Sequence, residues 1–130
     1  MTDDEKTSAR NEIAELMQRY AIASDFNDRD AYALLYTEDG VLEMPGARHN
    51  GREALRTRPK AEGVERRHFF LPPVLAFADG KAEGRGYCIV FTFEAGKAGP
   101  PRSVDYQTSF RHTAEGWRIA HHRVRPSFGG

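Results

Sequence analysis

The sequence predicts one α+β domain, a cone-like α+β barrel in which about three N-terminal helices pack on a curved, mainly antiparallel sheet. Two observations carry this prediction. Apolar residues recur at helical spacing early in the chain, whereas from residue 68 onward the pattern changes to the alternation typical of strands. Helices followed by strands favour a sheet covered by helices on one face. A length of 130 residues suits a single domain over 1–130.

The first helix is indicated by a stripe of residues at spacings of three and four, which are Ile13, Leu16, Met17, Tyr20 and Ser24. Either Thr2 or Asp4 is expected to cap its start, and Glu5 stands where a capping box with Thr2 requires it. The crowded polar residues of 25–30 compete with helical hydrogen bonds, so the helix is expected to end there.

Two shorter helices are expected next, over 31–36 and about 51–61. Asn50 and Glu53 have the spacing of a capping box at the start of the helix over 51–61. Strands are predicted between turns that contain glycine or proline, at about 41–44, 67–77, 81–94, 102–112 and 116–125.

Two kinds of glycine are distinguished in the strand region. The short turns at 78–81 and 113–116 contain glycine and predict antiparallel hairpins. Gly84 and Gly86 lie within a strand, where glycine is typical of a bend or bulge and lacks the helix that a dinucleotide-binding turn requires.

Charge and composition exclude several classes of function. The 19 Lys and Arg residues balance 19 Asp and Glu residues, so no long-range field favours nucleic acid or an anionic membrane surface. The acidic N-terminus does not resemble a signal peptide and no apolar stretch is long enough for a membrane span, so a cytoplasmic protein is expected. The single cysteine, Cys88, lies in an apolar run and is interpreted as a buried hydrophobe.

Asp25 and His68 are the candidate catalytic residues. A carboxylate bonded to one imidazole nitrogen fixes the tautomer and stabilises the imidazolium, so such a pair can remove a proton from carbon or from water without a metal. Strand alternation places His68 on one face with Phe70, Pro72 and Val74, which predicts an apolar wall around the imidazole. The alternatives are a helix-ending role for Asp25 and a solvated edge position for His68.

Several short motifs, in their order along the chain, resemble the nuclear-transport-factor-2-like fold and within it the SnoaL-like branch that contains scytalone dehydratase. The motifs are Ile13-x-x-Leu16-x-x-x-Tyr20-Ala21-x-x-x-Asp25, Gly51-Arg52-Glu53-Ala54-Leu55, Arg67-His68 and Gly116-Trp117-Arg118-Ile119. They extend over nearly the whole chain. Because each motif is short and degenerate, together they indicate the fold better than they indicate a reaction.

The resemblance implies a role for each candidate residue. In dehydratase-like members an Asp at the end of the first helix orients a His from the sheet, which removes a proton from the substrate, and Asp25 and His68 match these positions. The resemblance also implies that Tyr20 lines the pocket, where its hydroxyl can donate a hydrogen bond to the substrate. Simple core packing is the alternative for Tyr20.

Asp105 and Arg125 match accessory substrate-binding positions on the last two strands. The loop at 96–101 leaves the register of these strands open, so Arg123 competes with Arg125. The alternate polar set that contains Asp105 also fits a solvated or subunit-facing side of the sheet.

The predicted function is a cofactor-independent lyase of the dehydratase type, acting on a small, partly apolar cyclic or hydroxylated molecule. Hydrolysis or isomerisation in the same pocket is the competing enzymatic prediction, and a ligand-binding or oligomerisation module is the non-catalytic one. No metal is expected, because the adjacent His121 and His122 point to opposite faces of a strand and no closed ligand set accompanies them or His112.

A homo-oligomer is expected from the composition of one strand. Tyr87, Ile89, Phe91 and Phe93 alternate along it. If these side chains lie on the face away from the helices, another subunit is needed to cover them. The resemblance favours a trimer over a dimer.

Overall fold

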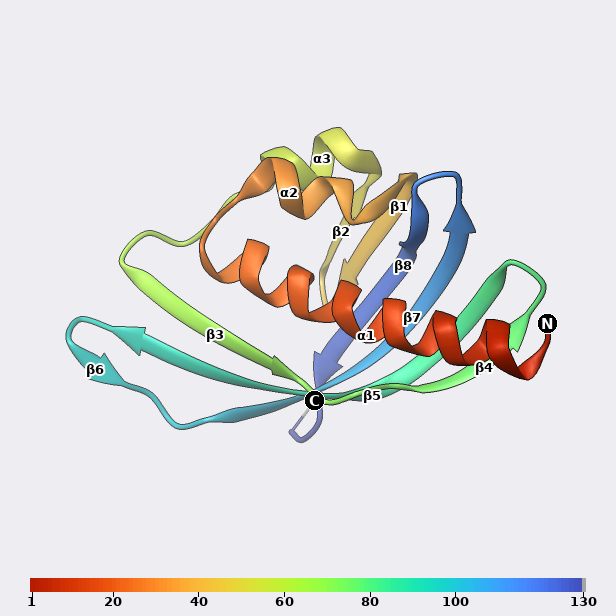
Figure 1. The fold of residues 1–130 in the computed structure, drawn as a ribbon. Coiled ribbons are helices and arrows are strands. Elements are labelled where there is room, and N and C mark those ends of the chain that lie inside the picture. The colour runs from red at the N-terminus through yellow and green to blue at the C-terminus, as the bar shows by residue number, and fades with distance from the viewer. Residues whose placement is uncertain (130) are drawn as a thin grey trace.

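A computed structural model describes residues 1–129 and contains three helices on one side of a curved sheet (Figure 1). The helices are α1 (Asp3–Asp25), α2 (Arg29–Leu34) and α3 (Gly51–Thr57). The strands are β1 (Tyr36–Met44), β2 (Ala47–Asn50), β3 (Val64–Phe70), β4 (Val74–Ala78), β5 (Lys81–Glu94), β6 (Lys97–Ala98), β7 (Arg102–Thr113) and β8 (Gly116–Pro126). The predicted α+β class, with helices on a curved sheet, is therefore confirmed.

The sheet is mixed but mostly antiparallel. Its strand order is β2-β1-β8-β7-β5-β3, and β4 and β6 also pair with β5. Both predicted hairpins are present, since β4 pairs antiparallel with β5 and β7 with β8. The exception is the parallel pairing of β1 with β8, which brings the chain from the helical part into the middle of the sheet.

Helix α1 begins and ends where its sequence predicts. Thr2 is the N-cap, and its hydroxyl accepts the Glu5 amide at 3.1 Å while the Glu5 carboxylate accepts the Thr2 amide at 2.9 Å. Asn27, just after the helix, has a φ of 57°, which a short polar residue tolerates better than most and which ends the helix. The apolar stripe of the helix is buried against the sheet, Ile13 completely.

Helix α3 is shorter than predicted and lacks the predicted capping box. Arg58 precedes Pro59, and a residue before proline is driven out of the helical region, so the helix ends at Thr57 rather than near residue 61. Asn50 occupies the N-cap position without a side-chain capping bond. Its side-chain oxygen instead accepts a hydrogen bond from Arg48, and Glu53 binds Arg56.

The strand predicted over 67–77 is divided into β3 and β4. The segment Leu71-Pro72-Pro73 interrupts it, because proline has no amide hydrogen to donate to a neighbouring strand. The interruption also changes the alternation. His68 and Phe70 face the helices, whereas Val74 is 80% exposed, so the predicted common face of these residues with Val74 is wrong.

Of the predicted bend or bulge at Gly84 and Gly86, the bulge is absent, since the pairing of β5 with β7 runs through both positions without a register shift. The two glycines make room for rings from β7. A Cβ on Gly86 would lie 2.7 Å from the Tyr106 hydroxyl, and a Cβ on Gly84 would lie 2.9 Å from the Phe110 ring. Register shifts lie elsewhere in the sheet, between Ser109 and Phe110 of β7 and between Tyr36 and Val41 of β1.

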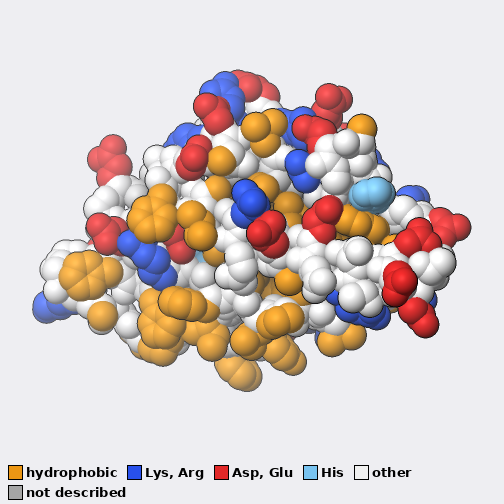
Figure 2. Space-filling view, viewed as in Figure 1, with side chains coloured by type: hydrophobic (Ala, Val, Ile, Leu, Met, Phe, Trp, Pro, Cys, Tyr) orange, Lys and Arg blue, Asp and Glu red, His pale blue; other side chains and the backbone are white. Residues whose placement is uncertain are grey.

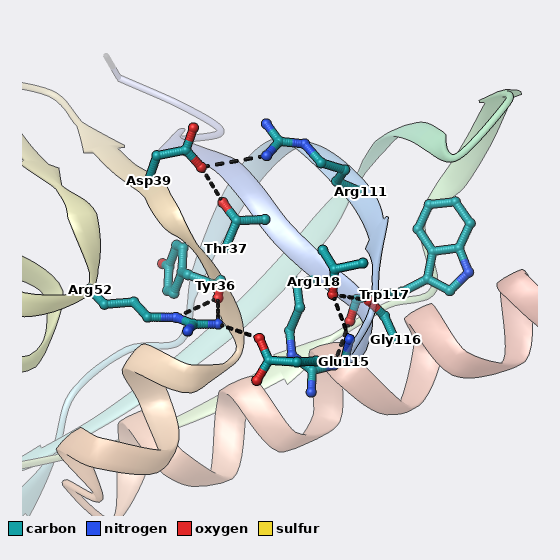
Figure 3. A network of polar contacts seen from close by, with 10 residues as sticks. Tyr36, Thr37, Asp39, Arg52, Arg111, Glu115, Gly116, Trp117 and Arg118 are labelled. Atoms are coloured by element: carbon teal, nitrogen blue, oxygen red, sulfur yellow. Dashed lines mark hydrogen bonds and ion pairs between the residues drawn. The ribbon is translucent and has the colours of Figure 1, made fainter.

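A polar network closes the end of the sheet that lies under α3 (Figure 3). Arg52 donates two hydrogen bonds to the Tyr36 carbonyl, at 2.7 and 3.0 Å, and one to Glu115 at 3.1 Å. On α1, the Glu12 carboxylate accepts the Trp117 amide at 2.5 Å, with Gly116 leaving space for it. The motifs around residues 51–55 and 116–119 therefore tie α1, α3 and the last hairpin together.

No helix within residues 1–129 combines the length and the apolar character that a membrane crossing needs.

Candidate active site

A cavity of about 440 Å³ lies between the helices and the inner face of the sheet. Its apolar wall is formed mainly by Leu42, Met44, Leu55, Phe70, Val90, Val104 and Val124. Polar groups enter this wall from α1, α2, β3 and β8, among them Tyr20, Tyr32, His68 and His122. An apolar chamber with a few convergent polar groups is the usual form of a small-molecule site.

The structure brings Asp25 and His68 together at the edge of this cavity. His68 Nδ1 lies 2.5 Å from Asp25 Oδ1, and the backbone amide of His68 donates to Asp25 Oδ2 at 2.9 Å. The Asp25 side chain is 6% exposed and the His68 side chain 23%. When the carboxylate accepts this hydrogen bond, Nδ1 is the donor, and Nε2 is the ring nitrogen that is not engaged by Asp25.

This contact joins the end of a helix to an edge strand of the sheet. Asp25 is the last residue of α1, and His68 lies on β3, the edge strand of the sheet, which packs against α1. An edge strand has amide groups without a strand partner, and the Asp25 carboxylate accepts one of them. The carboxylate thus fixes both the backbone and the ring of the same histidine.

Tyr20 belongs to a buried triangle of hydroxyl groups. The Tyr20 and Tyr32 oxygens are 2.9 Å apart, those of Tyr32 and Tyr36 are 3.1 Å apart, and Tyr36 donates to Tyr20 at 3.3 Å. Burial raises the pKa values of Tyr20 and Tyr36 well above the ordinary value, so both remain protonated. The Tyr20 ring lines the cavity, while its hydroxyl is bonded within the triangle.

A family model of the SnoaL-like domain matches residues 5–123. The chain belongs to the SnoaL-like family. A search among curated proteins gave no match.

Three solved structures share the architecture of this SnoaL-like chain. An NTF2-like protein with a cystatin-like fold from Novosphingobium aromaticivorans is 28% identical, with a TM-score of 0.85 over 97% of this chain and 86% of its own. Rv3472 of Mycobacterium tuberculosis, of unknown function, is 28% identical, with a TM-score of 0.85 over 95% and 75%. A Catenulispora acidiphila protein in complex with S-DNPA is 25% identical, with a TM-score of 0.76 over 92% and 94%.

His122 is a cavity residue that the sequence did not single out for this role. It is 1% exposed, lines the cavity, and its Nδ1 is 2.7 Å from the Thr108 hydroxyl. Burial, followed by the nearby His68 and His121, lowers its pKa to about 3, so the imidazole is neutral. The alternation of β8 that turns His121 outward was the available signal, because it turns His122 inward.

Cys88 also borders the cavity of this SnoaL-like chain. It is 2% exposed, and burial raises the pKa of its thiol to about 12. A thiol with such a pKa is a poor nucleophile at neutral pH, in agreement with its interpretation as a small hydrophobe.

Within residues 1–129 no group of three or more His, Cys, Asp or Glu side chains has the arrangement of a metal site.

Asp105 and Arg125 lie together, but not with Asp25 and His68. They are register partners on β7 and β8, and both border a separate hollow on the outer face of the sheet. Asp105 accepts a hydrogen bond from Ser127 at 2.6 Å. Alternation explains the placement, since Val104 and Val124, next to them in sequence, face the inner cavity. Arg123 lies on the outer side as well.

The inner cavity also carries positive charge that local sequence patterns did not indicate. Five of its lining residues are Arg29, Arg58, Lys60, Arg66 and Arg102, and among the described lining residues none is an Asp or Glu. Most of them come from coil or from strand ends, where basic residues are usually read as solvated surface. Their convergence depends on tertiary structure, which local patterns do not report.

Proposed function

We propose that this protein is a cofactor-independent acid–base enzyme of the dehydratase type, with His68 as the base and Asp25 as the residue that positions it. One observation carries the proposal: Asp25 holds both the imidazole and the backbone amide of His68, beside an apolar cavity that can admit a small molecule. A base held in one orientation and one tautomer is what proton abstraction from carbon requires.

The chemistry follows from the free Nε2 of His68. This nitrogen removes a proton from the carbon next to a substrate carbonyl, and the electron pair of the C–H bond moves into an enolate. The imidazolium, stabilised by Asp25, then returns the proton to the hydroxyl group on the adjacent carbon as the C–O bond breaks. Water leaves, a C=C bond forms, and the dyad regains its starting state without an external oxidant or reductant.

The developing enolate oxygen needs a hydrogen-bond donor in a site with little water. We assign Tyr20 to this region, together with His122, because both lie on the cavity wall and their rings are 4.9 Å apart. Tyr20 can donate to a substrate only by exchanging its bond within the tyrosine triangle, so the exchange is part of the proposal. Asp105 and Arg125 have no role in it, because they border the hollow on the outer face.

The related structure from Catenulispora acidiphila supports a small molecule as the ligand, since that protein was solved in a complex with S-DNPA. The lining of the present cavity favours a compact, partly apolar cyclic or hydroxylated compound. The same dyad can also activate water, which would support hydration or hydrolysis. Isomerisation would need only the transfer of a proton between two carbons.

We further propose that the protein is a homo-oligomer. Seven exposed apolar side chains lie on β3, β4, β5 and the segment after β3, namely Phe69, Leu71, Val74, Tyr87, Ile89, Phe91 and Phe93. Hydrophobic side chains gather along the lower edge of Figure 2, on the side of the sheet away from the helices. Further copies of the chain are the proposed cover for this surface, and the family resemblance favours a trimer over a dimer.

The experiment is a turnover screen of hydroxylated cyclic and aromatic ketones with the wild type and His68→Ala. Loss of water, gain of water, hydrolysis and isomerisation are followed by mass and by NMR. We expect conversion by the wild type and a loss of about 10²- to 10⁴-fold in His68→Ala. Full activity in the variant would contradict the assignment, and binding without turnover of any compound would favour a ligand-binding module.

A further inference from the structure

We infer that the cavity selects an anion: the substrate is a compact apolar molecule that carries a carboxylate, held by cationic side chains at the cavity rim. The inference rests on the proposed function for the identity of the cavity as the site, and it adds the charge of the molecule that enters.

The distribution of charge over the molecule is the first argument. The chain has as many acidic as basic residues, 19 of each, yet the described lining of the cavity has five basic residues and none that is acidic. An even mixture of signs would be expected if these were ordinary surface residues. The excess surrounds this cavity, where it acts on whatever enters.

Among the described residues, four of these cations also make no direct ion pair, although the Asp25 carboxylate acts on the pKa of Lys60. Arg19, Arg48, Arg52, Arg56 and Arg111 each have a carboxylate within 4 Å. Within residues 1–129, Arg58, Lys60, Arg66 and Arg102 have no such ion pair. We call these four residues the cationic rim. An anion from solution can therefore bind them without first displacing an internal partner.

The cationic rim is also built and held in place. Arg29 donates hydrogen bonds to the carbonyls of Arg56 and Arg58, at 3.2 and 2.6 Å, which fixes the segment after α3 over the cavity. The Arg58 guanidinium lies 5.3 Å from the centre of the Tyr32 ring, and Lys60 donates to the Ser24 carbonyl at 3.1 Å. Side chains that are already positioned lose less entropy when they bind a ligand.

The basic residues near Lys60 are close enough to affect its pKa. Burial is the largest cause that lowers its pKa, and although Asp25 opposes the shift, Arg66, Arg29 and Arg58 lower the pKa further. These cations therefore lie near enough to repel one another. A bound carboxylate reverses that repulsion, and arginine matches its planar, two-oxygen geometry.

The geometry orients the substrate as well. The cationic rim includes Arg66, two residues before His68 on the same face of β3, whereas the apolar wall lies deeper in the cavity. A carboxylate at the rim places the apolar part of the molecule inward, against that wall and beside the imidazole. The charge thus supplies orientation at a distance from the reacting carbon.

The test compares two probes of nearly equal shape, 2-naphthoate and 2-naphthamide, by titration calorimetry on the whole protein. We expect the wild type to bind the carboxylate at least about tenfold more tightly, and this preference to weaken as salt is raised. The double variant Arg58→Gln/Arg66→Gln is expected to lose most of the preference. The double variant Arg85→Gln/Arg123→Gln, which removes the same two charges from the outer face, is the matched control and keeps it.

Equal binding of the two probes, an unchanged preference in the double variant, or no binding of 2-naphthoate at millimolar concentration would each overturn the inference. His68→Ala is expected to retain the preference for the carboxylate, because the cationic rim is not part of the dyad. A retained preference without any turnover would therefore count against the proposed function alone. Turnover that depends on His68 without a charge preference would count against this inference alone.

Discussion

Val104 and Asp105 are neighbours on β7, but Val104 lines the cavity under the helices and Asp105 borders a hollow on the opposite face. The same contrast separates His122 from His121 on β8. The inner face combines a closed apolar wall with a few fixed polar groups, whereas the outer face combines exposed aromatic residues with charged ones. One strand therefore presents two different environments, because successive side chains alternate between the two faces of the sheet.

The largest effect is expected when Asp25, the carboxylate that contacts His68, is neutralised. Asp25→Asn keeps the size of the side chain but removes the charge that stabilises the imidazolium and selects its tautomer. We expect turnover to fall about 10²- to 10⁴-fold, measured as kcat on any substrate found by the screen. Asp39→Asn, an exposed carboxylate near Arg111, is the control. Equal effects of the two substitutions would remove the distinction between the dyad and the surface.

The two histidines of β8 are expected to differ in how they affect the stability of the protein at low pH. The folded pKa of His122, about 3, lies below its ordinary value of 6.5, so only the unfolded chain gains a proton between these values. The stability due to neutral His122 is complete above about pH 6.5 and declines as the pH falls toward 3. From pH 7.5 to 5.0, urea unfolding should show a loss of about 2 kcal/mol that His122→Asn largely removes.

The matched variant is His121→Asn, on the outer face of the same strand, where the side chain contacts Glu43. It is expected to keep the acid sensitivity of the wild type. If both variants lower the sensitivity equally, the burial of His122 is not its cause.

A smaller effect is expected from filling the space under Tyr106. In Gly86→Ala the new methyl group meets a ring whose hydroxyl already donates to the Leu71 carbonyl at 2.7 Å, so the ring cannot move away freely. We expect a loss of about 1–3 kcal/mol in the free energy of unfolding. Gly46→Ala tests the alternative of backbone strain, since its φ is 76° but nothing lies near its Cβ.

The smallest effect on stability is expected on the outer face. Phe91 is 46% exposed and packs edge-on against Phe69, so Phe91→Ser should lower the free energy of unfolding of a monomer by about 1 kcal/mol. The same substitution should shift the mass measured by light scattering toward the monomer. An unchanged oligomer, or a wild type that is already monomeric, would contradict the proposed cover of this surface.

The sequence predicted the alternation of the strands well, because a period of two is a local property. It also predicted the end of α1 and the Thr2 capping box. The division at Pro72 and Pro73 was missed because a short apolar run continues on both sides of it. The two-residue strand β6 and the short strand β2 were missed because pairing with β5 and β1, rather than composition, makes them strands.

The candidate site was predictable only in part. The positions of Asp25 and His68 were inferred from the resemblance together with strand alternation, and the structure places them in contact. The side of the sheet on which Asp105 and Arg125 lie depends on which alternate residues of β7 and β8 point toward the helices. The resemblance did not determine this. The cationic rim was not foreseen, because its members come from three separate segments and converge only in the folded chain.

The hydrogen bond between Asp25 and the backbone amide of His68 has a consequence for which mutations the protein can tolerate. One carboxylate joins the end of a helix to an edge strand and also contacts the imidazole, so loss of the Asp25 side chain removes both contacts at once. Substitution of His68 removes only the contact with the ring, because the backbone amide remains. Change is therefore more strongly constrained at Asp25 than at His68.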